Sequence, residues 1–118
     1  MQRIWMAAGC LAGLGAVAMA ALTTHAITEP GARQIAASGV QMHGWHALAL
    51  IGLGLWAPRG GLLTHAAGIA FVVGLILFCG AVYALAISGV SLGRIAPTGG
   101  ILLMVGWALF CASAIRGR

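Results

Sequence analysis

The sequence predicts an all-α integral membrane protein, a four-helix bundle with almost no chain outside the bilayer. Of its 118 residues, 62% are hydrophobic and only 6% are charged, whereas a soluble domain carries about a quarter charged residues. No lysine is present, and the charged residues all fall between or outside long apolar runs: Arg3, Glu29, Arg33, Arg59, Arg94, Arg116 and Arg118. This pattern is typical of bilayer spans joined by short loops, and it excludes a water-soluble core.

Four apolar runs define the helices, which we expect at about 4–25, 40–58, 64–88 and 97–115 of one transmembrane domain, residues 1–118. The apolar runs themselves, residues 4–22, 40–58, 66–87 and 97–115, have 19 to 22 residues each, and at helical rise this length is roughly 30 Å, the thickness of the hydrocarbon core. Backbone groups in lipid must be satisfied internally, and runs of this length without alternation are helices. Residues 28–39 are predicted as an external loop, in which Glu29-Pro30-Gly31 looks like a turn before a short surface helix.

The arginines predict the orientation of the bundle. An even number of helices puts both termini and the middle loop on one side, which then holds Arg3, Arg59, Arg116 and Arg118, against Arg33 and Arg94 on the other. The positive-inside rule therefore places both termini in the cytoplasm. In this register Trp5 and Trp56 fall together at the cytoplasmic interface, where indole rings are enriched, and His65 lies just before the third apolar run on the same side.

Polar side chains gather toward the external end of the predicted bundle. His25 closes the first helix, and His43 and His46 lie near the start of the second. Since residues three apart share a helix face, His43, His46 and His25 form a candidate three-nitrogen metal site, or a site for a haem edge. The alternatives are that His46 and His25 hydrogen-bond to backbone or to Tyr83 and tie helix ends together, or that they transfer protons.

Helical rise places Tyr83 at a depth similar to that of His46, so a contact between these two residues is expected. Gln41 is a further candidate member of the cluster. The candidate ligand-binding residues are therefore His25, Gln41, His46 and Tyr83.

The scarcity of charge excludes several functions. A single carboxylate, Glu29, leaves no pair for acid/base catalysis, and the chain has neither a glycine-rich phosphate cradle with lysine nor a nucleophile elbow. The net charge of +5 comes from scattered arginines rather than a basic face, so no nucleic acid is expected as a partner. We therefore expect that the chain has no enzymatic activity and binds no cofactor. The three cysteines, Cys10, Cys79 and Cys111, are interpreted as buried small hydrophobic residues.

Small residues indicate where helices approach one another. Ala8, Ala12, Ala16 and Ala20 recur at four-residue intervals beside a Gly9-x-x-x-Gly13 pair, and stripes of this kind allow close packing in membranes. Trp107, in the middle of the fourth helix, needs a hydrogen-bond acceptor for its indole N–H if it faces protein, and we interpret it as a packing residue.

Three segments carry a resemblance to a known family. Phe78-Cys79-Gly80-Ala81-Val82-Tyr83-Ala84-Leu85-Ala86-Ile87-Ser88 looks like an FSGSLYxLAL segment, Pro97-Thr98-Gly99-Gly100 to Gly106-Trp107 like PxGG...GW, and His46-Ala47-Leu48-Ala49-Leu50 like HxLAL. On these segments the chain resembles, over essentially its whole length, the YgdD-like small membrane proteins grouped under domain of unknown function 423. The resemblance implies four helices in the bacterial inner membrane and supplies no established activity.

Two positions depart from that family pattern. The first helix ends in Ala20-Ala21-Leu22-Thr23-Thr24-His25, where the family usually has Gly-Ala-x-Gly-Ala-His, so only the histidine matches. His43 stands where relatives are expected to carry glutamine. A three-histidine metal site would therefore be peculiar to this chain.

Three functional hypotheses follow. The leading one is a non-enzymatic accessory or structural subunit whose partners are membrane lipids and other membrane-protein subunits, or further copies of itself, because the loops are minimal and small-residue faces are available. The second is a metal- or small-ligand-binding module at the external face, built from the histidines and Tyr83. The third is transport of a small solute or lipid by an oligomer.

Overall fold

The structure is a computed structural model that describes residues 1–117, in which every regular element is an α-helix. The three helices are α1 (Gln2–His25), α2 (Pro30–Ser88) and α3 (Ile95–Arg116). All three are long and apolar enough to cross a membrane. Arg118, which we counted with the cytoplasmic arginines, lies outside the described residues.

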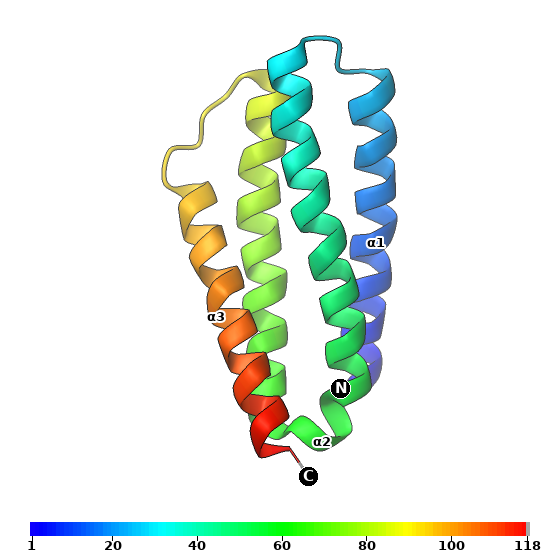
Figure 1. Cartoon of the computed structure of the whole chain (residues 1–118), viewed down its shortest axis with the longest axis vertical. Coiled ribbons are helices and arrows are strands. Elements are labelled where there is room, and N and C mark those ends of the chain that lie inside the picture. Colours follow the sequence, from blue (N-terminus) through cyan, green and yellow to red (C-terminus); the bar gives the residue numbers. More distant parts are fainter. Residues whose placement is uncertain (118) are drawn as a thin grey trace.

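Helix α2 is folded back on itself at Gly61. A straight helix of its 59 residues would be about 88 Å long, but the longest extent of the whole molecule is 49 Å. Gly61 has φ 62° and ψ −152°, a conformation that is essentially limited to glycine. Figure 1 shows the two arms of α2, residues 30–60 and 62–88, running side by side in opposite directions.

The turn at Gly61 corrects the predicted helix count from four to three. The predicted helices 40–58 and 64–88 are both parts of α2, because helical hydrogen bonding continues past Pro58 and resumes directly after Gly61. The predicted loop 28–39 is also wrong beyond its first residues, since α2 begins at Pro30. The turn at Glu29 is where we expected it, and the Glu29 carboxylate caps the helix by accepting hydrogen bonds from the Gly31 and Ala32 backbone.

Helices α1 and α3 each pack against α2, which supplies the middle of the molecule (Figure 1). Glycines allow these contacts: a Cβ at Gly9 of α1 would lie 2.9 Å from the Ala47 carbonyl oxygen, and a Cβ at Gly99 of α3 would lie 2.4 Å from the Phe78 nitrogen. Both glycines are therefore used inside the chain to bring helix backbones together. The start of α1 and the end of α3 lie at the same end of the bundle as the turn within α2 (Figure 1).

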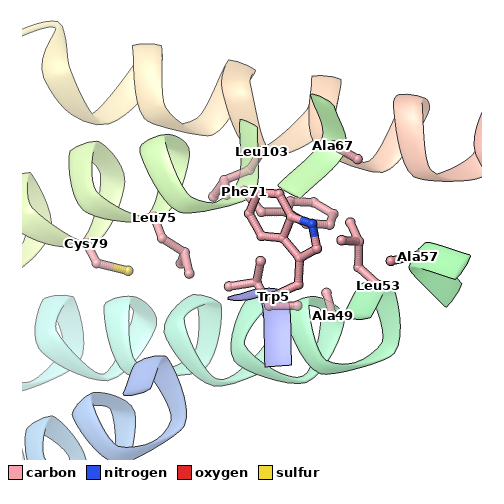
Figure 2. Close-up of a cluster of buried hydrophobic side chains, with 10 residues drawn as sticks. Trp5, Ala49, Leu53, Ala57, Ala67, Phe71, Leu75, Cys79 and Leu103 are labelled. Atoms are coloured by element: carbon pink, nitrogen blue, oxygen red, sulfur yellow. The ribbon is translucent and has the colours of Figure 1, made fainter. Parts of the chain in front are cut away.

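The core lies between the arms of α2 and is completed by side chains from α1 and α3. Phe71 and Leu53 are fully buried, and Leu50 and Leu103 are nearly so. Figure 2 shows the Trp5 indole directed from α1 toward Phe71, and Trp5 is 6% exposed, so its side chain packs between the helices. Large apolar side chains such as Leu11, Leu48 and Met104 face outward, as expected of a surface solvated by lipid.

Candidate functional site

His46 is buried and uses both ring nitrogens within the chain. It is 2% exposed, its Nδ1 lies 2.7 Å from the Met42 carbonyl oxygen, and its Nε2 accepts a hydrogen bond of 3.0 Å from the Trp107 indole. A carbonyl oxygen only accepts and an indole N–H only donates, so the proton of the neutral ring is on Nδ1. Trp107 thus has the acceptor that its position requires, and His46 ties α3 to the first arm of α2.

Aromatic rings surround this histidine. His46 and Trp107 both meet Phe71 edge-on, with ring centroids 5.5 and 5.2 Å apart, and Phe110 stacks on Trp107 at 6.4 Å. Edge-to-face and offset arrangements of this kind are favourable packing geometries. The arrangement is that of a packed structural histidine, and it leaves His46 no lone pair for a metal.

The expected contact between Tyr83 and His46 is replaced by one between Tyr83 and His43. The Tyr83 hydroxyl lies 3.0 Å from His43 Nδ1, across the two arms of α2, and the ring centroids are 6.0 Å apart. Both side chains are half-buried. His43 and His46 are three residues apart on one helix, but the first faces the second arm and α1, whereas the second faces α3.

A pocket of about 520 Å³ lies where α1 meets both arms of α2. Its walls are apolar apart from a thiol and the His43–Tyr83 pair, and its lining residues are Ala8, Leu11 and Ala12 of α1, His43 and Leu50 of the first arm, and Val72, Leu75, Ile76, Cys79, Gly80 and Tyr83 of the second arm. Leu11 and Ile76 are 69% and 66% exposed, so the rim lies on the lipid-facing surface. The size and lining are those of a small-molecule site with few polar groups.

The Cys79 thiol in this pocket already makes a hydrogen bond within the chain. Cys79 is buried and lies 3.6 Å from the Gly39 carbonyl oxygen, to which its S–H donates. Cys79 thus behaves as the small hydrophobe expected, whereas Cys10 and Cys111 are exposed on the lipid-facing surface. The pair of His43 and Tyr83 supplies the polar edge of the pocket.

The remaining predicted site residues lie elsewhere. His25 and Gln41 are exposed, and among residues 1–117 neither side chain takes part in a hydrogen bond. Residues 1–117 contain no group of three His, Cys, Asp or Glu side chains placed to hold a metal ion. The three-histidine site is therefore not formed, because His25, His43 and His46 point to three different surroundings.

A second polar cluster, unforeseen from the sequence, closes the end of the bundle near Gly61. The Ser113 hydroxyl accepts a hydrogen bond of 3.1 Å from the Trp56 indole, donates to the Gly60 carbonyl oxygen at 3.1 Å and bonds the Thr64 hydroxyl. Nearby, the Trp5 indole donates to His65 Nδ1 at 2.9 Å. The available signal was a polar residue near a helix end, since Ser113 interrupts the last apolar run and Thr64 lies just before the third one.

Comparisons with known proteins agree with this membrane architecture. The model of a family described as a protein of unknown function, DUF423, matches residues 14–100. The UPF0382 membrane protein YwdK of Bacillus subtilis is 29% identical over 123 residues, with 98% of each chain covered. The UPF0382 inner membrane protein YgdD of Escherichia coli K12 is 29% identical over 120 residues, covering 98% of this chain and 92% of that protein. No solved structure matches.

Proposed function

We propose a non-enzymatic ligand-binding role for this chain, which belongs to the DUF423 family and is a multi-pass protein of the inner membrane. The ligand enters from the lipid and lies in the pocket between α1 and the arms of α2. One observation carries the proposal: an apolar pocket of about 520 Å³ has a single polar edge, formed by His43 and Tyr83. In a bilayer, a polar pair of this kind beside a cavity is a default candidate for a functional site.

Helix α2 crosses the membrane twice in this proposal, so that the chain has four crossings. Support comes from the turn at Gly61, which brings the middle of the chain to the end that also holds both termini (Figure 1). That end carries Arg3, Arg59 and Arg116, and the other end carries Arg33 and Arg94. By the positive-inside rule the termini are cytoplasmic.

Cysteine labelling tests this topology. With Cys10, Cys79 and Cys111 replaced by alanine, Ser91→Cys should react with a membrane-impermeant thiol reagent added outside spheroplasts. Gln2→Cys should react only after lysis. Labelling of both from outside, or of Gln2→Cys alone, would contradict the orientation.

Filling the pocket tests the binding role. The protein is extracted into lipid nanodiscs directly from native membranes, and native mass spectrometry identifies the small molecules that remain bound. The wild type should retain a discrete species, and Ala12→Phe, which places a ring in the pocket, should lose it. Ala18→Phe is the matched control, because Ala18 is exposed on the same helix and lines none of the pockets. Identical bound species in the wild type, Ala12→Phe and Ala18→Phe would contradict the proposal.

Association with other membrane subunits is the second candidate. The small-residue stripe that first indicated it is largely consumed inside the chain, since Gly9 contacts α2 and Ala8 and Ala12 pack on the core. A second groove of about 470 Å³ between α1 and the first arm, lined by Gly44 and Trp45 among others, still offers a face for a further helix. Gly44 and Gly52 have open space where a side chain would be.

Photo-cross-linking separates this candidate from the first. A photoreactive residue at Leu48, which is 70% exposed between the two glycines, should capture a discrete partner in native membranes. The same residue at Met104 of α3, which is 65% exposed, serves as the control. Equally diffuse cross-linked products at Leu48 and Met104 would contradict the hypothesis of a partner subunit. Oligomeric transport gains no support from any feature of residues 1–117.

A further inference from the structure

The proton positions in the His43–Tyr83 pair follow from the strengths of the two groups as donor and acceptor. Among residues 1–117, His43 Nδ1 is the one hydrogen-bond partner of the Tyr83 hydroxyl, at 3.0 Å. A phenol O–H is a stronger donor than an imidazole N–H, and an unprotonated imidazole nitrogen is a stronger acceptor than a phenol oxygen, so the bond is stronger with Tyr83 as the donor. Tyr83 therefore donates to Nδ1, and the proton of the neutral His43 ring is on Nε2.

The Nε2 edge of His43 lies close to Gly15 of α1 and keeps some exposed surface, because among residues 1–117 no fully buried side-chain nitrogen lacks a hydrogen-bond partner. A Cβ built at Gly15 would lie 3.3 Å from His43 Nε2 and 3.1 Å from Cε1. No atom of residues 1–117 forms a hydrogen bond with Nε2. The N–H on Nε2 is thus an unused donor at the polar edge of the pocket, and a molecule that fills the pocket gains by supplying an acceptor.

The surroundings of the pocket disfavour a charged ligand. None of its lining residues carries a charge when His43 is neutral. Arg33, on the same arm as His43, is engaged elsewhere, since it donates to the Ile27 and Thr24 carbonyl oxygens at the end of α1. A carboxylate or phosphate placed here would be an unpaired ion in an apolar site, at a large desolvation cost.

Resting on the proposed function, we propose that the ligand is an uncharged molecule with a long apolar chain and a carbonyl oxygen at one end. The carbonyl accepts the hydrogen bond from His43 Nε2, and the chain lies along the apolar wall formed by α1 and the second arm of α2. Tyr83 is a positioning residue, because its O–H fixes the ring proton on Nε2. A chain-bearing quinone and a neutral acyl ester both satisfy this chemistry.

A quinone with a decyl chain is the probe, and its binding to protein in nanodiscs is followed by saturable quenching of tryptophan fluorescence. Ala12→Phe gives the background quenching from quinone dissolved in the lipid. His43→Leu removes the donor and should weaken binding about tenfold, the equivalent of one hydrogen bond to a desolvated partner. His43→Gln keeps an N–H donor and should restore most of the affinity.

Gly15→Ala is the second variant, because its Cβ would lie 3.3 Å from Nε2 and crowd that nitrogen without removing either member of the His43–Tyr83 pair. It should weaken quinone binding without lowering the thermal stability, which keeps the test valid if His43→Leu folds poorly. Wild-type affinity in both His43→Leu and Gly15→Ala would overturn the proposal.

Competition between the decyl quinone and other molecules of the same chain length shows which polar end group of a ligand the site binds. A methyl ester should displace the quinone, whereas the alkane and the carboxylate should be about tenfold weaker competitors. An ester whose affinity from competition equals that of the decyl quinone assigns the site to carbonyl compounds in general, and one that binds much more weakly assigns it to quinones. Strongest competition by the carboxylate would refute an uncharged ligand.

The failure of this inference is distinguishable from failure of the proposed function. If the alkane competes as well as the ester, and Ala12→Phe abolishes all binding, the pocket binds apolar chains and the carbonyl assignment is wrong. If Ala12→Phe binds like the wild type, the binding role of the pocket is wrong as well.

Discussion

The two polar clusters of this bundle differ in how completely they use their hydrogen bonds. Near Gly61, the Ser113 hydroxyl makes three bonds, donating to Gly60 and meeting Trp56 and Thr64, which exhausts its one donor and two acceptor positions. Thr64 and Ser113 are fully buried. This closed cluster holds the turn of α2 against the end of α3.

The His43–Tyr83 pair is open by comparison. It makes a single bond between its two members, and the remaining ring nitrogen faces a pocket and Gly15. This contrast distinguishes a structural polar group from a functional one in a membrane interior. A polar group whose donors and acceptors are all paired inside the chain stabilises the fold. A polar group that keeps an unpaired donor beside a cavity is available to a ligand. Substitutions in the two clusters should therefore have different consequences.

The largest expected effect belongs to Ser113→Ala in the closed cluster. Loss of this hydroxyl leaves the Trp56 N–H, the Thr64 O–H and the Gly60 carbonyl without their shared partner, at a cost of about 2–4 kcal/mol in unfolding free energy. Unfolding by a denaturing detergent, followed by circular dichroism, measures it. Ser91→Ala, in the exposed connection before α3, is the control. Equal stability of the two variants would show that the cluster does not hold the fold.

Gly61→Ala should have the next largest effect, about 1–3 kcal/mol, because φ 62° and ψ −152° are strongly disfavoured for any residue with a Cβ. Gly52→Ala is the matched control, since Gly52 lies inside a helical arm and a Cβ there meets nothing within 4 Å. The same detergent titration compares them. A stable Gly61→Ala protein would mean that the turn has an alternative backbone path.

Tyr83→Phe, in the open pair, should lower stability by less than about 1 kcal/mol, because one bond at the edge of a pocket is lost and His43 can reorient. Its main effect should be on binding of the decyl quinone, since the ring proton of His43 is no longer held on Nε2. A destabilisation as large as that of Ser113→Ala would erase the distinction between the clusters.

The smallest effect is expected outside the membrane, at the start of α2. Hydrogen bonds from the Gly31 and Ala32 backbone lower the pKa of Glu29 from its ordinary 4.5. A carboxyl with a lowered folded pKa stabilises the protein above its unfolded pKa, and the contribution is lost as pH falls through the folded pKa. Glu29→Ala should thus melt slightly earlier than the wild type at neutral pH, and the difference should vanish in strongly acidic buffer. Gln34→Ala should show no such pH dependence.

The apolar runs were sufficient to predict an all-helical membrane protein and to locate α1 and α3 within about two residues at each end. They misplaced the start of α2, because bilayer thickness limits the apolar segment and not the helix. Residues 30–39 extend the helix by about 15 Å beyond the predicted span. The Glu29-Pro30-Gly31 turn marks the true beginning of α2, which the apolar pattern alone does not show.

The side-chain partners were harder to predict than the helices. Similar depth suggested that Tyr83 meets His46, but depth does not fix the rotation of one helix about its axis relative to another. His46 turns toward Trp107 on α3, and His43, one turn earlier, turns toward Tyr83. The small size of Gly15 made room for the His43 ring, and a single missing Cβ leaves little signal in a chain with 19 glycines.

The turn of α2 also bears on how the chain is made. Gly61 alone departs from helical geometry there, so no stretch of hydrated linker separates the two arms. If both arms cross the membrane as proposed, they enter the lipid together as one antiparallel hairpin, and the Gly60 carbonyl oxygen at the bend accepts a hydrogen bond from Ser113 near the end of α3. A reporter domain inserted at Gly61 would separate the two arms of α2 and disrupt the bundle. A reporter domain inserted between Gly89 and Arg94 would lie in the exposed connection at the opposite end and leave the helix packing intact.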